Sequence, residues 1–183
     1  MKKIFGILVL IIVVVVGAVL LLWKGDKPVS DIQAVATDYK NISYVIEGQS
    51  VMLVNGLSEK EVAPGSASKI VTRYFGNEVR HDLDGDGRED VAFLLTQETG
   101  GSGTFYYLVA ALNKETGYVG SQALLLGDRI APQTTEVGEG KGIVVNYADR
   151  APGESFAVRP SIGKSLRVLL DPNTLRFGEA GQI

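Results

Sequence analysis

The chain contains no cysteine and a single histidine among its 183 residues. The lack of cysteine excludes a disulfide framework, a thiolate zinc site, an iron–sulfur site and a lipid anchor on cysteine. One histidine also argues against a histidine-rich metal centre. The length allows one domain with an additional segment rather than two full domains. About 140 residues suffice for a core that needs no disulfide.

Positive charge is scarce in most of the chain. Residues 1–23 hold two of the 18 basic side chains and none of the 21 acidic ones, so residues 24–183 carry a net charge of −5. An acidic domain repels the phosphates of nucleic acids rather than binding them. Nucleic acid is therefore not expected as a partner.

One long hydrophobic run, Ile4–Leu22, contains only Ile, Phe, Gly, Leu, Val and Ala. As a helix it would be about 28 Å long, close to the hydrocarbon thickness of a bilayer. Inside lipid its backbone groups are satisfied only within the segment, which favours a helix despite the many β-branched residues. The run predicts a transmembrane helix that contacts the lipid bilayer through residues 4–22.

The flanks of this run predict its orientation. Lys2 and Lys3 precede it, which favours a cytoplasmic N-terminus and an extracytoplasmic domain. We expect residues 1–24 to be an uncleaved signal anchor in the cell membrane. The alternative is a cleaved secretory signal, for which Ala34-Val35-Ala36 has the required small residues but lies far downstream. Both alternatives export the domain.

Glycine is abundant after the anchor, since the chain holds 22 glycines, about 12% against an average near 7%. Residues 25–41 read as a polar tether, in which Ser30 is placed to cap a short helix over Asp31–Tyr39. From residue 42 onward, short stretches rich in β-branched and aromatic residues alternate with turns. The predicted strands are Ile42–Ile46, Ser50–Val54, Lys69–Phe75, Asp90–Thr96, Thr104–Leu112, Tyr118–Leu126, Ile130–Val137, Ile143–Tyr147, Leu166–Leu170 and Thr174–Phe177.

These strands, with short connections and no long amphipathic helix, predict a mainly β fold. We expect an antiparallel sheet or sandwich-like single domain over residues 42–183, preceded by one N-terminal transmembrane helix. No repeat of fixed period supports a propeller or a solenoid.

The clearest chemical motif is the acidic segment His81–Asp90. Counted from Asp82, carboxylates fall at positions 1, 3, 5 and 9, and a glycine that permits a sharp turn falls at position 6. Alternating carboxylates in a tight loop suit Ca²⁺, which prefers six to eight oxygen ligands. A solvated acidic turn is the simpler alternative. The predicted calcium ligands are Asp82, Asp84, Asp86, the main-chain carbonyl of Arg88, and Asp90.

This loop lacks the bidentate glutamate of an EF-hand, because position 12 is Phe93. It resembles the Asp-x-Asp-x-Asp-Gly-x-x-Asp calcium loops of FG-GAP and VCBS-type extracellular β modules, over about nine residues and without their repeats. Together with Ala-Phe-Leu-Leu-Thr-Gln and Gly-Gly-Ser-Gly-Thr-Phe-Tyr-Tyr after it, the loop is similar to small membrane-anchored proteins of bacterial envelopes. That resemblance extends over residues 42–160 and implies no activity.

Ser66-Ala67-Ser68-Lys69 matches the Ser-x-x-Lys motif of penicillin-recognising enzymes. Neither Ser-Asp-Asn nor Lys-Thr-Gly follows it, so a polar turn is the preferred interpretation. No catalytic residue is therefore assigned, and His81 is expected at the rim of the ion loop. The sequence predicts a non-enzymatic binding or accessory module of the cell envelope that binds an envelope protein or polymer. The alternative is a Ser/Lys hydrolase acting on cell-wall material.

Overall fold

The computed structural model describes residues 37–180. Their regular structure consists of β-strands and one short 3-10 helix, η1 (Tyr39–Asn41). This confirms the mainly β class, and the described residues contain no α-helix. The strands are β1 (Ser43–Ile46), β2 (Gln49–Met52), β3 (Leu57–Glu61), β4 (Lys69–His81), β5 (Asp90–Glu98), β6 (Phe105–Lys114), β7 (Gly117–Gly120), β8 (Leu124–Asp128), β9 (Ala131–Val137), β10 (Ile143–Asp149), β11 (Ile162–Asp171) and β12 (Arg176–Glu179).

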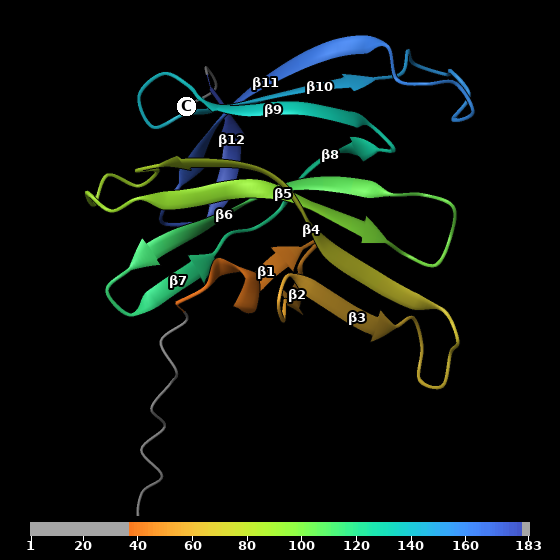
Figure 1. Cartoon of the computed structure of the whole chain (residues 1–183), viewed down its shortest axis with the longest axis horizontal. Coiled ribbons are helices and arrows are strands. Elements are labelled where there is room, and N and C mark those ends of the chain that lie inside the picture. The colour runs from red at the N-terminus through yellow and green to blue at the C-terminus, as the bar shows by residue number, and fades with distance from the viewer. Residues whose placement is uncertain (1–36, 181–183) are drawn as a thin grey trace, which may run out of the picture. The chain divides into compact units, whose positions relative to one another are not determined.

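The strands form three sheets whose strand pairs are antiparallel (Figure 1). The largest has six strands in the order β3-β4-β5-β6-β7, with β8 pairing with β6 beside β7. A second sheet has the order β12-β11-β10-β9, and the third is the β1–β2 hairpin. Eight of the eleven pairs of consecutive strands among the described residues are neighbours in a sheet, as expected for short turns.

β5 and β6 lie at the centre of the six-stranded sheet, and both of their faces are buried. Alternate side chains of a strand point to opposite faces. On β5, Val91, Phe93 and Leu95 face the β1–β2 hairpin, whereas Ala92 and Leu94 face the four-stranded sheet. All five side chains are fully buried. This explains why β5 reads as a continuous apolar run rather than an alternating one.

Two cores result from this arrangement. One lies between the six-stranded and four-stranded sheets, and the other lies between the six-stranded sheet and the β1–β2 hairpin. The second core is rich in aromatic side chains, with Tyr39, Tyr44 and Tyr74 packed around Phe93 at ring-centroid distances of 5.4–5.6 Å. The acidic loop lies between β4 and β5, so both ends of it are fixed by the central sheet.

Two expected strands differ clearly from the structure, and one strand was not expected. Tyr118–Leu126 was predicted as one strand, but it is broken at Ser121–Ala123, where the chain also bonds to Val45 of β1. The predicted strand Lys69–Phe75 continues to His81 through irregular pairing around Gly76. β3 was missed because its sequence, Leu-Ser-Glu-Lys-Glu, is mostly charged, and four of its five residues are exposed.

The predicted short helix over Asp31–Tyr39 falls mostly outside the described residues. Its end was predicted wrongly, because Thr37 and Asp38 are not helical and η1 begins only at Tyr39. Asp38 caps η1, and its carboxylate accepts the amide of Lys40 at 2.8 Å. The predicted transmembrane segment at residues 4–22 also lies outside the described residues.

Candidate metal centre

The acidic loop joins β4 to β5 and is built on one buried leucine. Leu83 is 1% exposed and packs into the core between the two larger sheets, which fixes the start of the loop. Gly85 and Gly87 have φ angles of +85° and +84°, a conformation that favours glycine. The expected sharp turn at position 6 is therefore present at Gly87.

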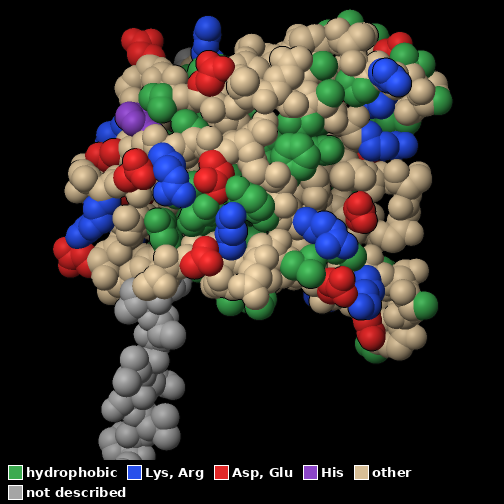
Figure 2. All heavy atoms as spheres, viewed as in Figure 1, with side chains coloured by type: hydrophobic (Ala, Val, Ile, Leu, Met, Phe, Trp, Pro, Cys, Tyr) green, Lys and Arg blue, Asp and Glu red, His purple; other side chains and the backbone are tan. Residues whose placement is uncertain are grey.

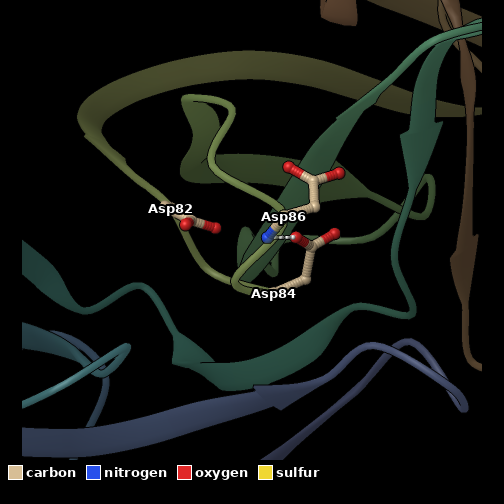
Figure 3. A group of neighbouring side chains, drawn as sticks. All are labelled: Asp82, Asp84 and Asp86. Carbon is tan, nitrogen blue, oxygen red and sulfur yellow. Dashed lines mark hydrogen bonds between the residues drawn. The ribbon is translucent and has the colours of Figure 1, made fainter.

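Three carboxylates converge in this loop (Figure 3). One oxygen each from Asp82, Asp84 and Asp86 lies within 4.8 Å of the others. Calcium ligands lie about 2.3–2.6 Å from the ion, so two ligands of one ion are at most about 5 Å apart. The spacing of the three oxygens therefore fits a single hard cation.

The same carboxylates also hold the loop in shape. Asp82 accepts the amides of Gly85 at 2.6 Å and Gly87 at 3.1 Å. Asp84 accepts the amide of Asp86 at 3.0 Å, and Asp86 accepts the amide of Arg88 at 2.9 Å. Each aspartate therefore fixes the turn that follows it, and the geometry of the loop depends on its acidic side chains.

Lys114 supplies positive charge to the loop from the end of β6. Its ammonium group contacts Asp84 and lies 3.1 Å from Asp86. The hydrogen bond from the Arg88 amide, and then that from Lys114, holds the pKa of Asp86 below its usual range. A calcium ion that took ligands from both carboxylates would compete with this ammonium group. The Lys114 side chain is one-third exposed, so an ion that displaced its ammonium group would release it toward solvent.

Asp90 lies apart from the three converging carboxylates. It is fully buried, and its two oxygens accept the amides of Leu83 at 2.9 Å and Asn113 at 2.7 Å. These bonds tie the start of the loop and the end of β6 to the first residue of β5. Burial raises the pKa of Asp90, although both hydrogen bonds oppose that rise. Its role as a calcium ligand stays a prediction, as does that of the Arg88 carbonyl.

The loop also contacts the four-stranded sheet. Lys141, in the turn between β9 and β10, donates to the carbonyl oxygen of Asp84 at 2.8 Å. His81 lies at the rim, where its Nε2 atom is 2.8 Å from the carbonyl oxygen of Gly140. The acidic loop therefore connects the two larger sheets.

Sequence reasoning did not identify Lys114 or Lys141 as neighbours of the loop. Lys114 could have been found from the antiparallel pairing of β5 with β6. Val91 lies opposite Ala111, so the residues after Ala111, which include Lys114, run toward the acidic loop that precedes β5. No local pattern marks Lys141, whose approach depends on how the two sheets pack.

The Ser-x-x-Lys motif has no catalytic arrangement. The Ser66 hydroxyl oxygen accepts the amide of Ser68 at 3.1 Å. Lys69 forms an ion pair with Glu59 at 2.7 Å, and both of these side chains are largely exposed. Ser66 and Lys69 therefore bond to different partners, which agrees with the interpretation of this motif as a polar turn.

Comparison with protein-family models, with curated proteins and with solved structures finds no match for this chain. None of the helices in the described residues has the length and apolar character needed to cross a membrane.

Proposed function

We propose that this protein is a membrane-anchored, extracytoplasmic β domain with a structural calcium loop, serving as a non-enzymatic binding or accessory module of the cell envelope. The anchor and its orientation rest on the hydrophobic run at residues 4–22 and the two lysines before it. The described residues 37–180 form a mainly β domain of antiparallel sheets, which supports the domain part of this proposal.

The convergence of Asp82, Asp84 and Asp86 carries the calcium proposal. Three carboxylates so close together repel one another unless positive charge lies between them. Lys114 supplies one positive charge, and a divalent ion would neutralise more of the group. Arg88 and Asp90 complete the proposed ligand set, with water supplying further oxygens.

The charges on one face of the domain do not favour nucleic acid as a partner. On the face in Figure 2, acidic and basic side chains are interspersed, and hydrophobic side chains form separate small patches. This surface offers no continuous basic field for nucleic acid. The hydrolase alternative has no support from the separate contacts of Ser66 and Lys69.

Thermal unfolding of the full chain in detergent tests the calcium loop. Calcium at 100 times its Kd should stabilise the folded domain by about 2.7 kcal/mol, because the unfolded chain cannot organise the ligands. Asp84→Ala should abolish most of this response, and Glu89→Ala is the matched control from the same loop. Magnesium should substitute poorly, since it demands tighter octahedral geometry. Equal melting temperatures in calcium and in chelator would reduce the loop to an acidic turn.

External protease added to intact spheroplasts tests the anchor. Digestion should remove the domain after Lys24 and leave a small protected N-terminal fragment, because the two lysines retain the N-terminus inside. A fully protected domain would contradict the orientation. A mature N-terminus near Thr37 would instead indicate a cleaved signal.

A further inference from the structure

β2 and β3 begin as a hairpin that opens after its first pair of residues. β2 ends at Met52, and Leu53 and Val54 lead from it into the two-residue turn Asn55-Gly56 before β3, with φ angles of +52° and +77° in the turn. Val54 and Leu57 exchange two backbone hydrogen bonds of 2.9 and 3.1 Å across this turn. Beyond that pair, no backbone hydrogen bond joins β2 to β3 in the described part of the chain. The strands can be followed from the turn in Figure 1.

The opening leaves two strand edges facing each other. Hydrogen-bonding groups of a strand alternate between its two sides. Leu57 bonds toward β2, so the main-chain groups of Glu59 and Glu61 point the same way, away from β4. Val54 bonds toward β3. By the same alternation, the main-chain groups of Ser50 and Met52 point away from β1. None of these four residues has a main-chain partner on that side among residues 37–180.

The space between these edges, here named the β2–β3 slot, is a cavity of about 450 Å³. This volume lies within the range of about 300–1,000 Å³ that is typical of ligand sites. Its floor includes Thr72 and Gln97, which are 1% and 7% exposed. The Gln97 side-chain amide donates to the Thr72 hydroxyl oxygen at 3.0 Å. The amide oxygen of Gln97 accepts no hydrogen bond from a described residue, so it is available to a ligand.

Exposed hydrophobic side chains lie on the segments beside the slot, and Met52 lines the cavity itself. Eleven large hydrophobic side chains are exposed in the described residues, and four of them, Met52, Val54, Leu57 and Val62, lie on or next to β2 and β3. Unpaired strand edges are usually covered or blunted because they pair readily with other chains. Unpaired edges beside exposed apolar side chains therefore indicate a surface that binds another chain.

The charged groups that line the slot define what an occupant must carry. Lys69 neutralises Glu59 at 2.7 Å, which leaves Glu47 and Lys60 as lining groups of opposite sign. Glu47 lies at the β1–β2 turn, at the open end, and Lys60 lies on β3. An occupant with a basic residue toward Glu47 and an acidic residue toward Lys60 complements both charges.

We propose that the β2–β3 slot binds an extended peptide segment of a partner protein, which adds as a strand between β2 and β3. β2 and β3 are antiparallel at the turn, so the added strand is antiparallel to one and parallel to the other. Its backbone amides pair with both edges, and alternate side chains face the Thr72–Gln97 floor. This proposal gives a partner class to the proposed binding role and rests on it, but it does not require calcium.

The probe is the peptide acetyl-Lys-Thr-Val-Thr-Val-Glu-amide, titrated into the full chain in detergent and followed by amide exchange and binding calorimetry. Without peptide, the amides of Ser50, Met52, Glu59 and Glu61 should exchange quickly, and the amides of Ser58 and Lys60, paired with β4, should be protected. Peptide should protect the four edge amides. The same peptide with its alternate amide nitrogens methylated should bind at least tenfold more weakly, because it cannot donate to an edge.

Two variants of one residue separate edge pairing from charge. Glu59→Pro removes an N–H that faces the slot and no hydrogen bond to β4, and proline is tolerated in an edge strand with that orientation. It should weaken peptide binding at least tenfold, whereas Glu59→Gln should bind as the parent does. Each titration is run in calcium and in chelator, so failure of the calcium loop is read separately from failure of the slot.

Three results would overturn the proposal. Edge amides protected in the free protein would mean that the hairpin is closed in solution. Protection that rises with protein concentration, without peptide, would assign the slot to a second copy of this chain. Absent binding, or equal binding of the methylated peptide, would exclude recognition through strand addition.

Discussion

Asp90 stabilises the domain through two backbone hydrogen bonds, and its removal should be costly with or without calcium. The side chain is fully buried and accepts the amides of Leu83 and Asn113 at 2.9 and 2.7 Å. A hydrogen bond to a charged acceptor contributes about 1.5–3 kcal/mol, and an unpaired buried amide costs a similar amount. Burial of the carboxylate, which raises its pKa, offsets part of this gain. Asp90→Ala should therefore destabilise the domain by about 3 kcal/mol.

For a domain of this size, about 3 kcal/mol corresponds to a fall in melting temperature of roughly 10 °C. Asp90→Asn retains the shape and one acceptor oxygen but turns an NH₂ group toward one of the amides, so about half of the loss is expected. The assay is thermal unfolding of the full chain followed by circular dichroism in excess chelator. Glu89→Ala, an exposed neighbour, should change the stability by less than about 0.5 kcal/mol.

Two results would refute this reasoning. An Asp90→Ala melting temperature within 2 °C of the parent, a threshold of roughly 0.5–1 kcal/mol, would show that the two bonds contribute little. If Asp90→Ala lowered the melting temperature in calcium but not in chelator, Asp90 would act through the ion rather than through the amides of Leu83 and Asn113.

Two further predictions concern Lys114 and Tyr39. Lys114→Met should raise calcium affinity roughly tenfold, equivalent to about 1.4 kcal/mol, because the ion no longer displaces an ammonium group from Asp84. Calcium binding measured by calorimetry that is unchanged or weaker would contradict this. Burial, and then the hydrogen bond to Glu78, raises the pKa of Tyr39 to about 12. The resulting stabilisation should be complete below about pH 10 and lost as the pH rises through about 12. In an alkaline titration followed by absorbance, the difference between the parent and Tyr39→Phe should be one tyrosine that ionises near pH 12, and a difference near pH 10 would contradict the assignment.

Part of the fold followed from local patterns. The β1–β2 hairpin and the central strand β5 were expected from short apolar stretches beside turns, and the structure contains both. Alternation of apolar and polar residues and glycine-containing turns each involve only a few consecutive residues, so they can be recognised in the sequence. The extension of β4 to His81 and the break at Ser121–Ala123 could not be predicted from the sequence, because both depend on which strand lies alongside.

The candidate site divides in the same way. The sequence by itself determined the spacing of Asp82, Asp84 and Asp86 and the need for glycine at Gly87, because a short loop constrains its own backbone. Only the tertiary structure brought Lys114 to this loop and turned Asp90 toward the amides of Leu83 and Asn113. It also decided that β2 and β3 separate after one pair. Lys114 is 30 residues from Asp84 and Asn113 is 23 residues from Asp90, so packing between elements sets these two contacts rather than any local preference.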